Sequence, residues 1–173
     1  IMVKKIFLSF PILLSLFGCI QKQYKIERDD YGEPILNNKT KYGFNKLPTE
    51  DDLKKIDTMA FYIQVFEEKY YNENEIKNPR IIIFHKDGFF KNESLLNFGK
   101  FDKHRNKNSV YYGGKYKIEK DSIFLEEFYP IRGDFTKYYV KEINEGILQG
   151  DRIIFKNDNV ITIFEKRKEL PKR

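Results

Sequence analysis

Short runs of β-branched and aromatic residues, interrupted every few positions by Asp, Asn, Gly or Pro, fill the chain from residue 59 to residue 165. Isoleucine, phenylalanine, tyrosine and threonine are prominent in these runs, and such residues favour strands. The whole sequence contains one alanine, Ala60, so the strongest helix former is almost absent. Because short strands with short links pair with their sequence neighbours, the pattern predicts an all-β antiparallel meander and excludes a helical bundle.

The expected strands alternate with turn formers, and one short helix precedes them. Thr49 is a suitable N-cap, Glu50 begins an acidic first turn, and Lys54 and Lys55 lie near the other end, which predicts a helix of about two turns. The apolar run 81–84 lacks alternation and so predicts a strand that is covered on both faces. Strands are expected at 59–67, 80–86, 89–93, 110–119, 122–129, 136–144, 147–149, 151–156 and 160–165.

The clearest hairpin signal lies in residues 116–125. A four-residue turn at 119–122 places Ile118 opposite Ile123 and Tyr116 opposite Leu125, so that these large apolar side chains share one face. The C-terminal runs have the same plan, with a turn at 156–159. The resulting candidate core or ligand face consists of Tyr116, Ile118, Ile123, Leu125, Ile153 and Phe155.

Two glycine positions indicate sharp changes of backbone direction. Asp87-Gly88 suits a tight hairpin, because both residues tolerate positive φ. Gly113-Gly114 lies among tyrosines and predicts a bulge that lets the sheet coil.

The N-terminus has the order of a secretory signal. Lys4 and Lys5 precede an apolar stretch at 6–17, which as a helix would reach only ~18 Å across a hydrocarbon core of roughly 30 Å. The stretch ends in Leu16-Phe17-Gly18-Cys19, which resembles the lipobox of bacterial lipoproteins. A secretory signal with a chance cysteine is the alternative.

The lipobox resemblance implies that residues 1–18 are a lipoprotein signal peptide, cut between Gly18 and Cys19, and that the Cys19 thiol carries the lipid. Two or three acyl chains, such as palmitate, hold a protein stably on a membrane where one does not. Some bacterial lipoproteins carry a run of acidic residues after the cysteine that resembles a signal for export to the cell surface. Residues 20–23 lack such a run, so we expect an outer-membrane protein that faces the periplasm. Loss of Lys4 and Lys5 lowers the formal charge from +6 to +4.

Residues 19–48 read as a lipid-anchored tether, because they mix charge with turn formers and have no sustained period. Tyr24, Tyr31, Tyr42 and Phe44 indicate that part of this tether lies on the domain. Residues 49–173 then form the β domain. Cys19 is the only cysteine, so no disulfide is expected and the apolar core alone must stabilise the domain.

Several segments of this domain resemble the successive hairpins of the small lipocalin-like domains on lipoproteins of Bacteroidota. They are Asp87-Gly88-Phe89-Phe90, Gly114-Lys115-Tyr116-Lys117-Ile118, Asp121-Ser122-Ile123-Phe124-Leu125 and Gly150-Asp151-Arg152-Ile153-Ile154-Phe155. The resemblance covers about residues 57–166 and implies a lipocalin-like barrel or half-barrel, in a family of uncharacterised function. The chain has no Trp and therefore lacks the Gly-x-Trp signature of true lipocalins, which disfavours a conventional lipocalin pocket.

Adjacent carboxylates occur twice, at 67–68 and at Glu126-Glu127. Neighbours on a strand point to opposite faces, so neither pair can converge on one substrate, and we expect solvated strand ends. His85 and His104 are the only histidines, and His85-x-Asp87 lacks a third ligand of known proximity for a metal. Hydrolase, zinc, phosphate-loop and calcium-loop motifs are absent from the sequence. We therefore expect no catalytic residue, metal or cofactor.

These observations favour a non-enzymatic envelope lipoprotein that serves as a binding or accessory module with a protein or envelope partner. The alternatives are a carrier of a small apolar ligand in the barrel and an envelope hydrolase. Large inward side chains favour a filled barrel with at most a shallow apolar opening and weak small-molecule binding. The basic tail at 166–168 and 172–173 is expected to be solvated, with anionic lipid head groups a nearer partner than nucleic acid.

Overall fold

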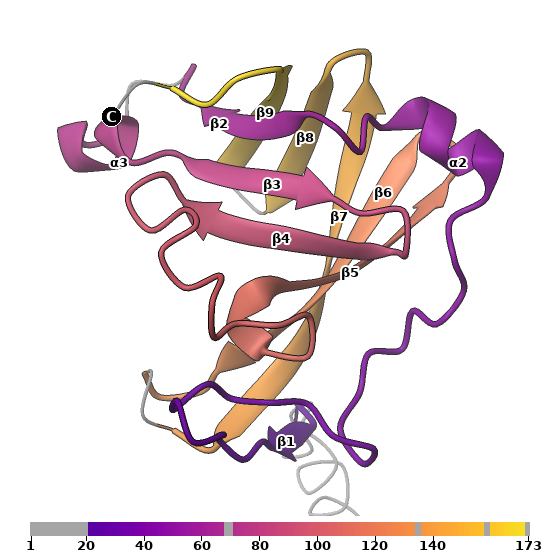
Figure 1. Ribbon diagram of the computed structural model, residues 1–173. Coiled ribbons are helices and arrows are strands. Elements are labelled where there is room, and N and C mark those ends of the chain that lie inside the picture. Colours follow the sequence, from indigo (N-terminus) through magenta and orange to yellow (C-terminus); the bar gives the residue numbers. More distant parts are fainter. Residues whose placement is uncertain (1–20, 68–70, 134–135, 158–159, 172–173) are drawn as a thin grey trace, which may run out of the picture.

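The computed structural model describes residues 21–67, 71–133, 136–157 and 160–171. It shows a closed antiparallel barrel of eight strands, with a further strand on its outside (Figure 1). Each barrel strand pairs with its sequence neighbour, and the last pairs with the first, so the predicted meander barrel is confirmed and is fully closed. The barrel strands are β2 (Phe61–Val65), β3 (Arg80–Phe84), β4 (Phe89–Ser94), β5 (Gly113–Glu119), β6 (Ser122–Pro130), β7 (Tyr138–Gln149), β8 (Arg152–Asn157) and β9 (Val160–Arg167).

Strands β5 and β6 pair in the predicted register. Ile118 lies opposite Ile123 and Tyr116 lies opposite Leu125. Lys120 has a φ of 54° in the turn between them. The register follows from the alternation of apolar residues together with the short turn, and it directs these four side chains into the barrel.

Strand β7 is longer than expected. The predicted break between 144 and 147 is wrong, because Gly146 stays within the strand and pairs with Ile123 on one side and Phe155 on the other. A Cβ atom at position 146 would lie 2.7 Å from the Phe155 ring. The glycine is therefore a packing requirement of a continuous strand.

Three elements were not predicted as such. Strand β1 (Gln23–Lys25) pairs with β7 outside the barrel, and α3 (Glu73–Lys77) lies between β2 and β3. The 3₁₀ turn η1 (Val110–Tyr112) replaces the start of the strand expected at 110–119. The two glycines that follow η1 begin β5 and let it approach β6 closely. A Cβ at Gly114 would lie 2.0 Å from the Glu126 carbonyl oxygen.

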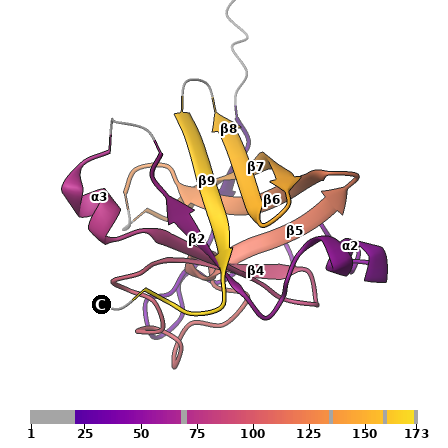
Figure 2. The same cartoon turned by 90° about the horizontal axis from the view of Figure 1, so that it is seen from above.

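The predicted helix is α2 (Glu50–Lys55). The Thr49 side chain accepts from the Asp52 amide at 3.2 Å, and the Asp52 carboxylate accepts from the Thr49 amide at 2.9 Å, which is a capping box. Ile56 follows the helix and packs into the barrel core. Both views place α2 and α3 at opposite ends of the barrel (Figures 1 and 2).

The main core fills the barrel from the α2 end. Strand β3 is covered on both faces, as expected: Ile82 and Phe84 lie in the main core, whereas Ile81 packs outside against Ile63 and Leu95. No helix in the described ranges is both long and apolar enough to cross a membrane. The buried residues of the main core are Ile56, Tyr62, Ile82, Phe84, Phe90, Tyr116, Ile118, Ile123, Leu125, Ile153, Phe155 and Phe164.

Residues 23–44 pack along the outside of β6 and β7 (Figure 1). Ile26 and Tyr42 form a second apolar cluster with Phe128 and Tyr139. The described part of the segment that reads as a tether is therefore attached to the domain over much of its length.

Candidate functional site

The interior of the barrel changes character along its axis. Apolar side chains fill the half next to α2, whereas a cavity of about 190 Å³ remains toward the end where β3 begins. Ile82, Leu125, Phe155 and Phe164 form its apolar wall. The polar residues that line it are Arg80, Asn92, Glu127, Tyr129, Glu142, Asn144, Asn157 and Thr162.

A chain of hydrogen bonds connects five of these polar side chains across four strands. The Glu127 carboxylate on β6 accepts from Asn92 Nδ2 on β4 at 2.9 Å and from the Tyr129 hydroxyl at 2.6 Å. The Tyr129 oxygen accepts from Asn144 Nδ2 at 3.4 Å, and Asn144 Oδ1 accepts from Asn157 Nδ2 at 3.5 Å. The network fixes the carboxylate in place, because each of its oxygens accepts from a different strand position.

Tyr129 remains a hydrogen-bond donor to Glu127 at neutral pH. Burial raises the pKa of the Tyr129 hydroxyl well above its usual range, and the neighbouring Glu127 charge raises it further. The Arg80 guanidinium opposes this shift in the Tyr129 pKa, so its positive charge is felt within the same cavity. Among the described residues, no cation forms an ion pair with Glu127.

Asn92 leaves one acceptor unused. Its Nδ2 must face the carboxylate of Glu127, because an ionised carboxylate only accepts hydrogen bonds. Its Oδ1 is then buried and has no hydrogen-bond partner among the described residues. Leaving a buried polar atom unpaired costs about 1–3 kcal/mol, so this oxygen is an unfavourable feature of the polar interior.

The structure corrects the expectation for Glu126 and Glu127. They point to opposite faces of β6, as predicted, but they are not solvated, because the exposed fractions of the two residues are 1% and 7%. Glu126 lies outside the barrel and accepts from the Gly43 amide at 2.7 Å and the Phe44 amide at 2.8 Å. Its carboxylate also forms an ion pair with Lys141 at 2.8 Å.

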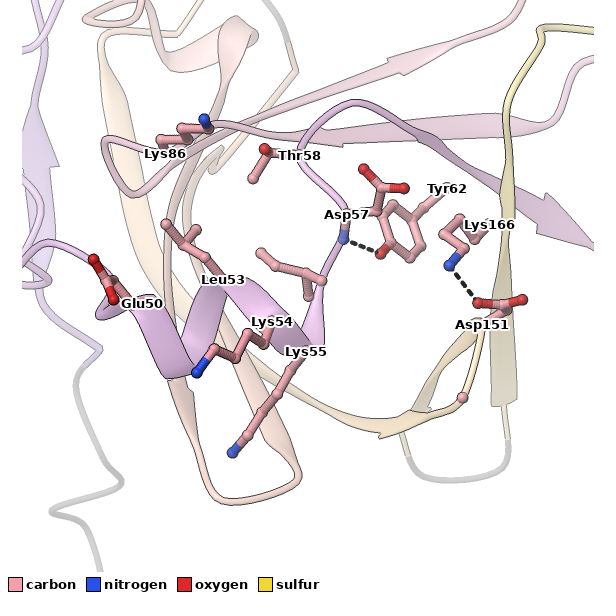
Figure 3. Close-up of a pocket in the computed structure, with 12 residues that line it drawn as sticks. Glu50, Leu53, Lys54, Lys55, Asp57, Thr58, Tyr62, Lys86, Asp151 and Lys166 are labelled. Atoms are coloured by element: carbon pink, nitrogen blue, oxygen red, sulfur yellow. Dashed lines mark hydrogen bonds and ion pairs between the residues drawn. The ribbon is translucent and has the colours of Figure 1, made fainter.

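A larger cavity of about 700 Å³ lies between α2 and the ends of β8 and β9 (Figure 3). Several of its charged groups have partners within the chain, whereas Glu50 and Lys86 are exposed. Lys166 pairs with Asp151 at 2.5 Å, and Lys55 donates to the Lys120 carbonyl. The Asp57 amide donates to the Tyr62 hydroxyl at 2.8 Å. The barrel interior differs from this cavity, because it holds a buried carboxylate and a buried acceptor atom without a partner among the described residues.

The two histidines have separate local roles. His85 Nε2 contacts the Tyr112 hydroxyl at 2.7 Å, and burial lowers the His85 pKa below its usual value. His104 stacks on Tyr31 with ring centroids 4.6 Å apart. Within the described parts of the chain, no group of three or more His, Cys, Asp or Glu side chains is arranged to hold a metal ion.

All six residues of the sequence-derived core or ligand face lie in the main core, and two of them, Leu125 and Phe155, also line the cavity. Gly18 and Cys19 lie outside the described residues.

The polar residues that line the cavity were not predicted from the sequence, although β6 carries a signal for them. Glu127 and Tyr129 continue the inward alternation begun by Ile123 and Leu125, so polar side chains follow apolar ones on the same face.

Comparisons of this chain with protein-family models, with curated proteins and with solved structures found no match. What the chain does has to be inferred from its geometry. The most informative part of that geometry is the polar cavity, because it combines a buried carboxylate, an unused acceptor and free volume inside a closed barrel.

Proposed function

We propose that this chain is a non-enzymatic binding module of the bacterial cell envelope, anchored by lipid at Cys19, which binds a small polar molecule at the open end of its barrel. The observation that carries the proposal is the division of the interior. The apolar half is filled by the chain's own side chains, and the remaining volume has polar walls around Glu127. Convergent polar groups in a preformed cavity are typical of small-molecule sites.

The filled core argues against the alternative of a carrier for an apolar ligand. Phe84 and Phe90 are fully buried, and Tyr116 is nearly so, so large side chains occupy the part of the barrel next to α2. The cavity of about 190 Å³ is smaller than the roughly 300–1,000 Å³ of sites for drug-sized ligands. A molecule with a few non-hydrogen atoms and hydrogen-bonding groups fits this volume better than a lipid does.

Lipid attachment at Cys19 would hold the barrel near the membrane. Strand β1 begins at Gln23, four positions after Cys19, and even a fully extended chain of that length reaches only about 14 Å. Because residues 23–44 pack on the domain, they add no free spacer. The proposed module therefore samples molecules close to one membrane surface.

Occupancy of the cavity can be tested with two matched substitutions on β7. Asn144→Phe puts an aromatic ring into the cavity, whereas Ile143→Phe puts the same ring on the outer face, where Ile143 is 54% exposed. Native mass spectrometry of protein purified from its host should show a small polar ligand with the Ile143→Phe variant and none with Asn144→Phe. A stoichiometric long-chain lipid bound equally to both variants would refute the proposal and restore the apolar carrier.

A second candidate function is that of an accessory subunit for an envelope protein. An outer groove of about 680 Å³ favours it, because apolar side chains from Val65, Ile76, Leu95 and Leu170 line the groove and Ile76 is 50% exposed. A photo-crosslinking residue at position 76 should then capture one protein species in intact cells. The same residue at the exposed position Lys156, on β8, should capture none.

A further inference from the structure

We infer that the polar cavity takes a small cationic ligand, a primary amine in its ammonium form, with Glu127 as the counter-ion. The inference rests on the proposed function and names the ligand class for the same cavity. It starts from a contrast among the buried acidic side chains of this protein.

Three glutamates are buried in the described part of the chain: Glu93, Glu126 and Glu127. Glu93 forms ion pairs with Lys91 at 3.2 Å and with Arg105 at 2.9 Å. Glu126 pairs with Lys141 at 2.8 Å. Glu127 has hydrogen bonds from neutral groups only, so it alone of the three lacks a cation within ion-pair distance.

This difference coincides with the position of the cavity. Glu93 and Glu126 lie on outer faces of the barrel, where loops and the N-terminal segment bring their partners to them. Glu127 faces the free interior volume. A buried carboxylate without a cation is unfavourable, and an ammonium group that enters the cavity would supply the missing charge.

The remaining acceptors suit an ammonium group as well. The two hydrogen bonds to Glu127 occupy one site on each oxygen, and a carboxylate has about four acceptor sites in all. Asn92, which lines the same cavity, has a second acceptor, Oδ1, without a donor among the described residues. An ammonium group has three donors and no acceptor, so it complements the free acceptor sites of the Glu127 carboxylate.

The shape of the cavity limits the rest of the ligand. Leu125 and Phe155 give it an apolar wall, and Glu142 and Arg80 add one carboxylate and one guanidinium at its exposed rim. A short alkyl chain with one ammonium group satisfies both the wall and the buried charge. Simple alkylamines are therefore the appropriate probe.

The test compares n-butylammonium with n-butanol, which has similar size and no charge, by isothermal titration calorimetry and by NMR shifts of the full chain. We expect the wild-type protein to bind the amine and to prefer it to the alcohol. Glu127→Gln removes the charge and keeps the shape, and it should weaken amine binding by about tenfold or more. Glu145→Gln, at an exposed outward position on β7, should leave binding unchanged.

Thermal unfolding checks that the Glu127→Gln variant folds, because the substitution removes a buried charge and also one of the two oxygens that accept from Asn92 and Tyr129. If that variant does not fold, the preference of the wild-type protein for the amine over the alcohol tests the charge. The Asn144→Phe and Ile143→Phe pair then tests the position of the site, and only the former should abolish amine binding. Equal affinity for amine and alcohol, or amine binding that survives Glu127→Gln, would overturn the inference while leaving a polar-ligand site intact. Absence of any ligand in the host-purified protein together with no amine binding would overturn the proposed function as well.

Discussion

Glu126 and Glu127 are adjacent in the sequence, yet their carboxylates are buried on opposite faces of β6 and bind different parts of the chain. Glu126 fastens the N-terminal segment to the outside of the barrel through the amides of Gly43 and Phe44. Glu127 lies inside and organises the polar cavity. One strand thus links the packing of the N-terminal segment to the geometry of the candidate site.

Removal of the Glu126 carboxylate should release the N-terminal segment. Glu126→Ala should lower the free energy of unfolding by about 3 kcal/mol, because it breaks a buried ion pair and leaves two backbone amides without their acceptor. Urea denaturation measures this loss, and limited proteolysis should then cut first within residues 41–48. Glu145→Ala is the control, and it should change stability by less than about 0.5 kcal/mol. Equal effects of the two substitutions would mean that the carboxylate does not hold the segment.

The hairpin of β5 and β6 should contribute strongly to stability. Leu125→Ala and Ile123→Ala should each lower the free energy of unfolding by about 2–5 kcal/mol, since both side chains are buried in the main core. Lys117→Ala should cost about 1 kcal/mol at most, because its contacts are an ion pair with Glu119 and ring contacts at the surface. Chemical denaturation of the three variants tests the register directly, and a similar small loss in all three would contradict it.

The sequence was sufficient to predict this hairpin, because its register depends on local alternation and a short turn. Tyr116 and Leu125 are nine positions apart, and no long-range information is needed to pair them. The closure between β2 and β9 is a different case, because it joins the first and last strands of the barrel, and local patterns left a closed barrel and a half-barrel as alternatives. The long strand β7 was divided in error, because Gly146 looks like a turn residue until its contact with Phe155 is known.

The candidate site was harder to predict, because its members come together only when the barrel closes. Asn92, Glu127, Asn144 and Asn157 belong to different strands and have no characteristic spacing. The burial of Glu126 was missed for a related reason: the segment that covers it is irregular, and sequence patterns do not place irregular segments. The helix α3 did carry a signal, since Asn72 and Glu75 form a capping box at 3.0 Å and 3.1 Å.

Two glycines should respond differently to the addition of a methyl group. Gly146→Ala places a Cβ 2.7 Å from the ring of Phe155, and we expect a destabilisation of about 1–3 kcal/mol from overpacking. Phe155→Leu makes room and should partly relieve this loss in a double-mutant cycle. Gly114→Ala meets the Glu126 carbonyl at 2.0 Å, and no side-chain replacement relieves a clash with the backbone. If Phe155→Leu rescues neither or both variants, the assigned contacts are wrong.

The partly buried ring of His85 should make stability sensitive to acid. Burial, and then the charge of Lys107, lowers the pKa of His85 in the folded state below its usual value near 6.5. The unfolded chain therefore binds the proton more readily, so stability falls as the pH drops below about 6.5 and continues to fall until the folded-state pKa is reached. His85→Gln removes this contribution between pH 7.5 and 5. Urea midpoints of wild type and variant across this range should diverge on acidification, and parallel curves would contradict the assignment.

The proposed lipid anchor at Cys19 gives a chemical prediction that does not depend on the barrel. Cys19 is the only cysteine of the chain, so a thioether-linked lipid would leave the processed protein without any free thiol. A maleimide reagent should therefore fail to label the processed, denatured protein, and it should label the unprocessed precursor. Cys19→Ser should accumulate as precursor and lose detergent-phase partitioning, whereas Ser15→Ala, which keeps the cysteine, should be processed normally. Processing and membrane attachment of the Cys19→Ser variant would show that a simple secretory signal, with an unrelated cysteine, is the better explanation.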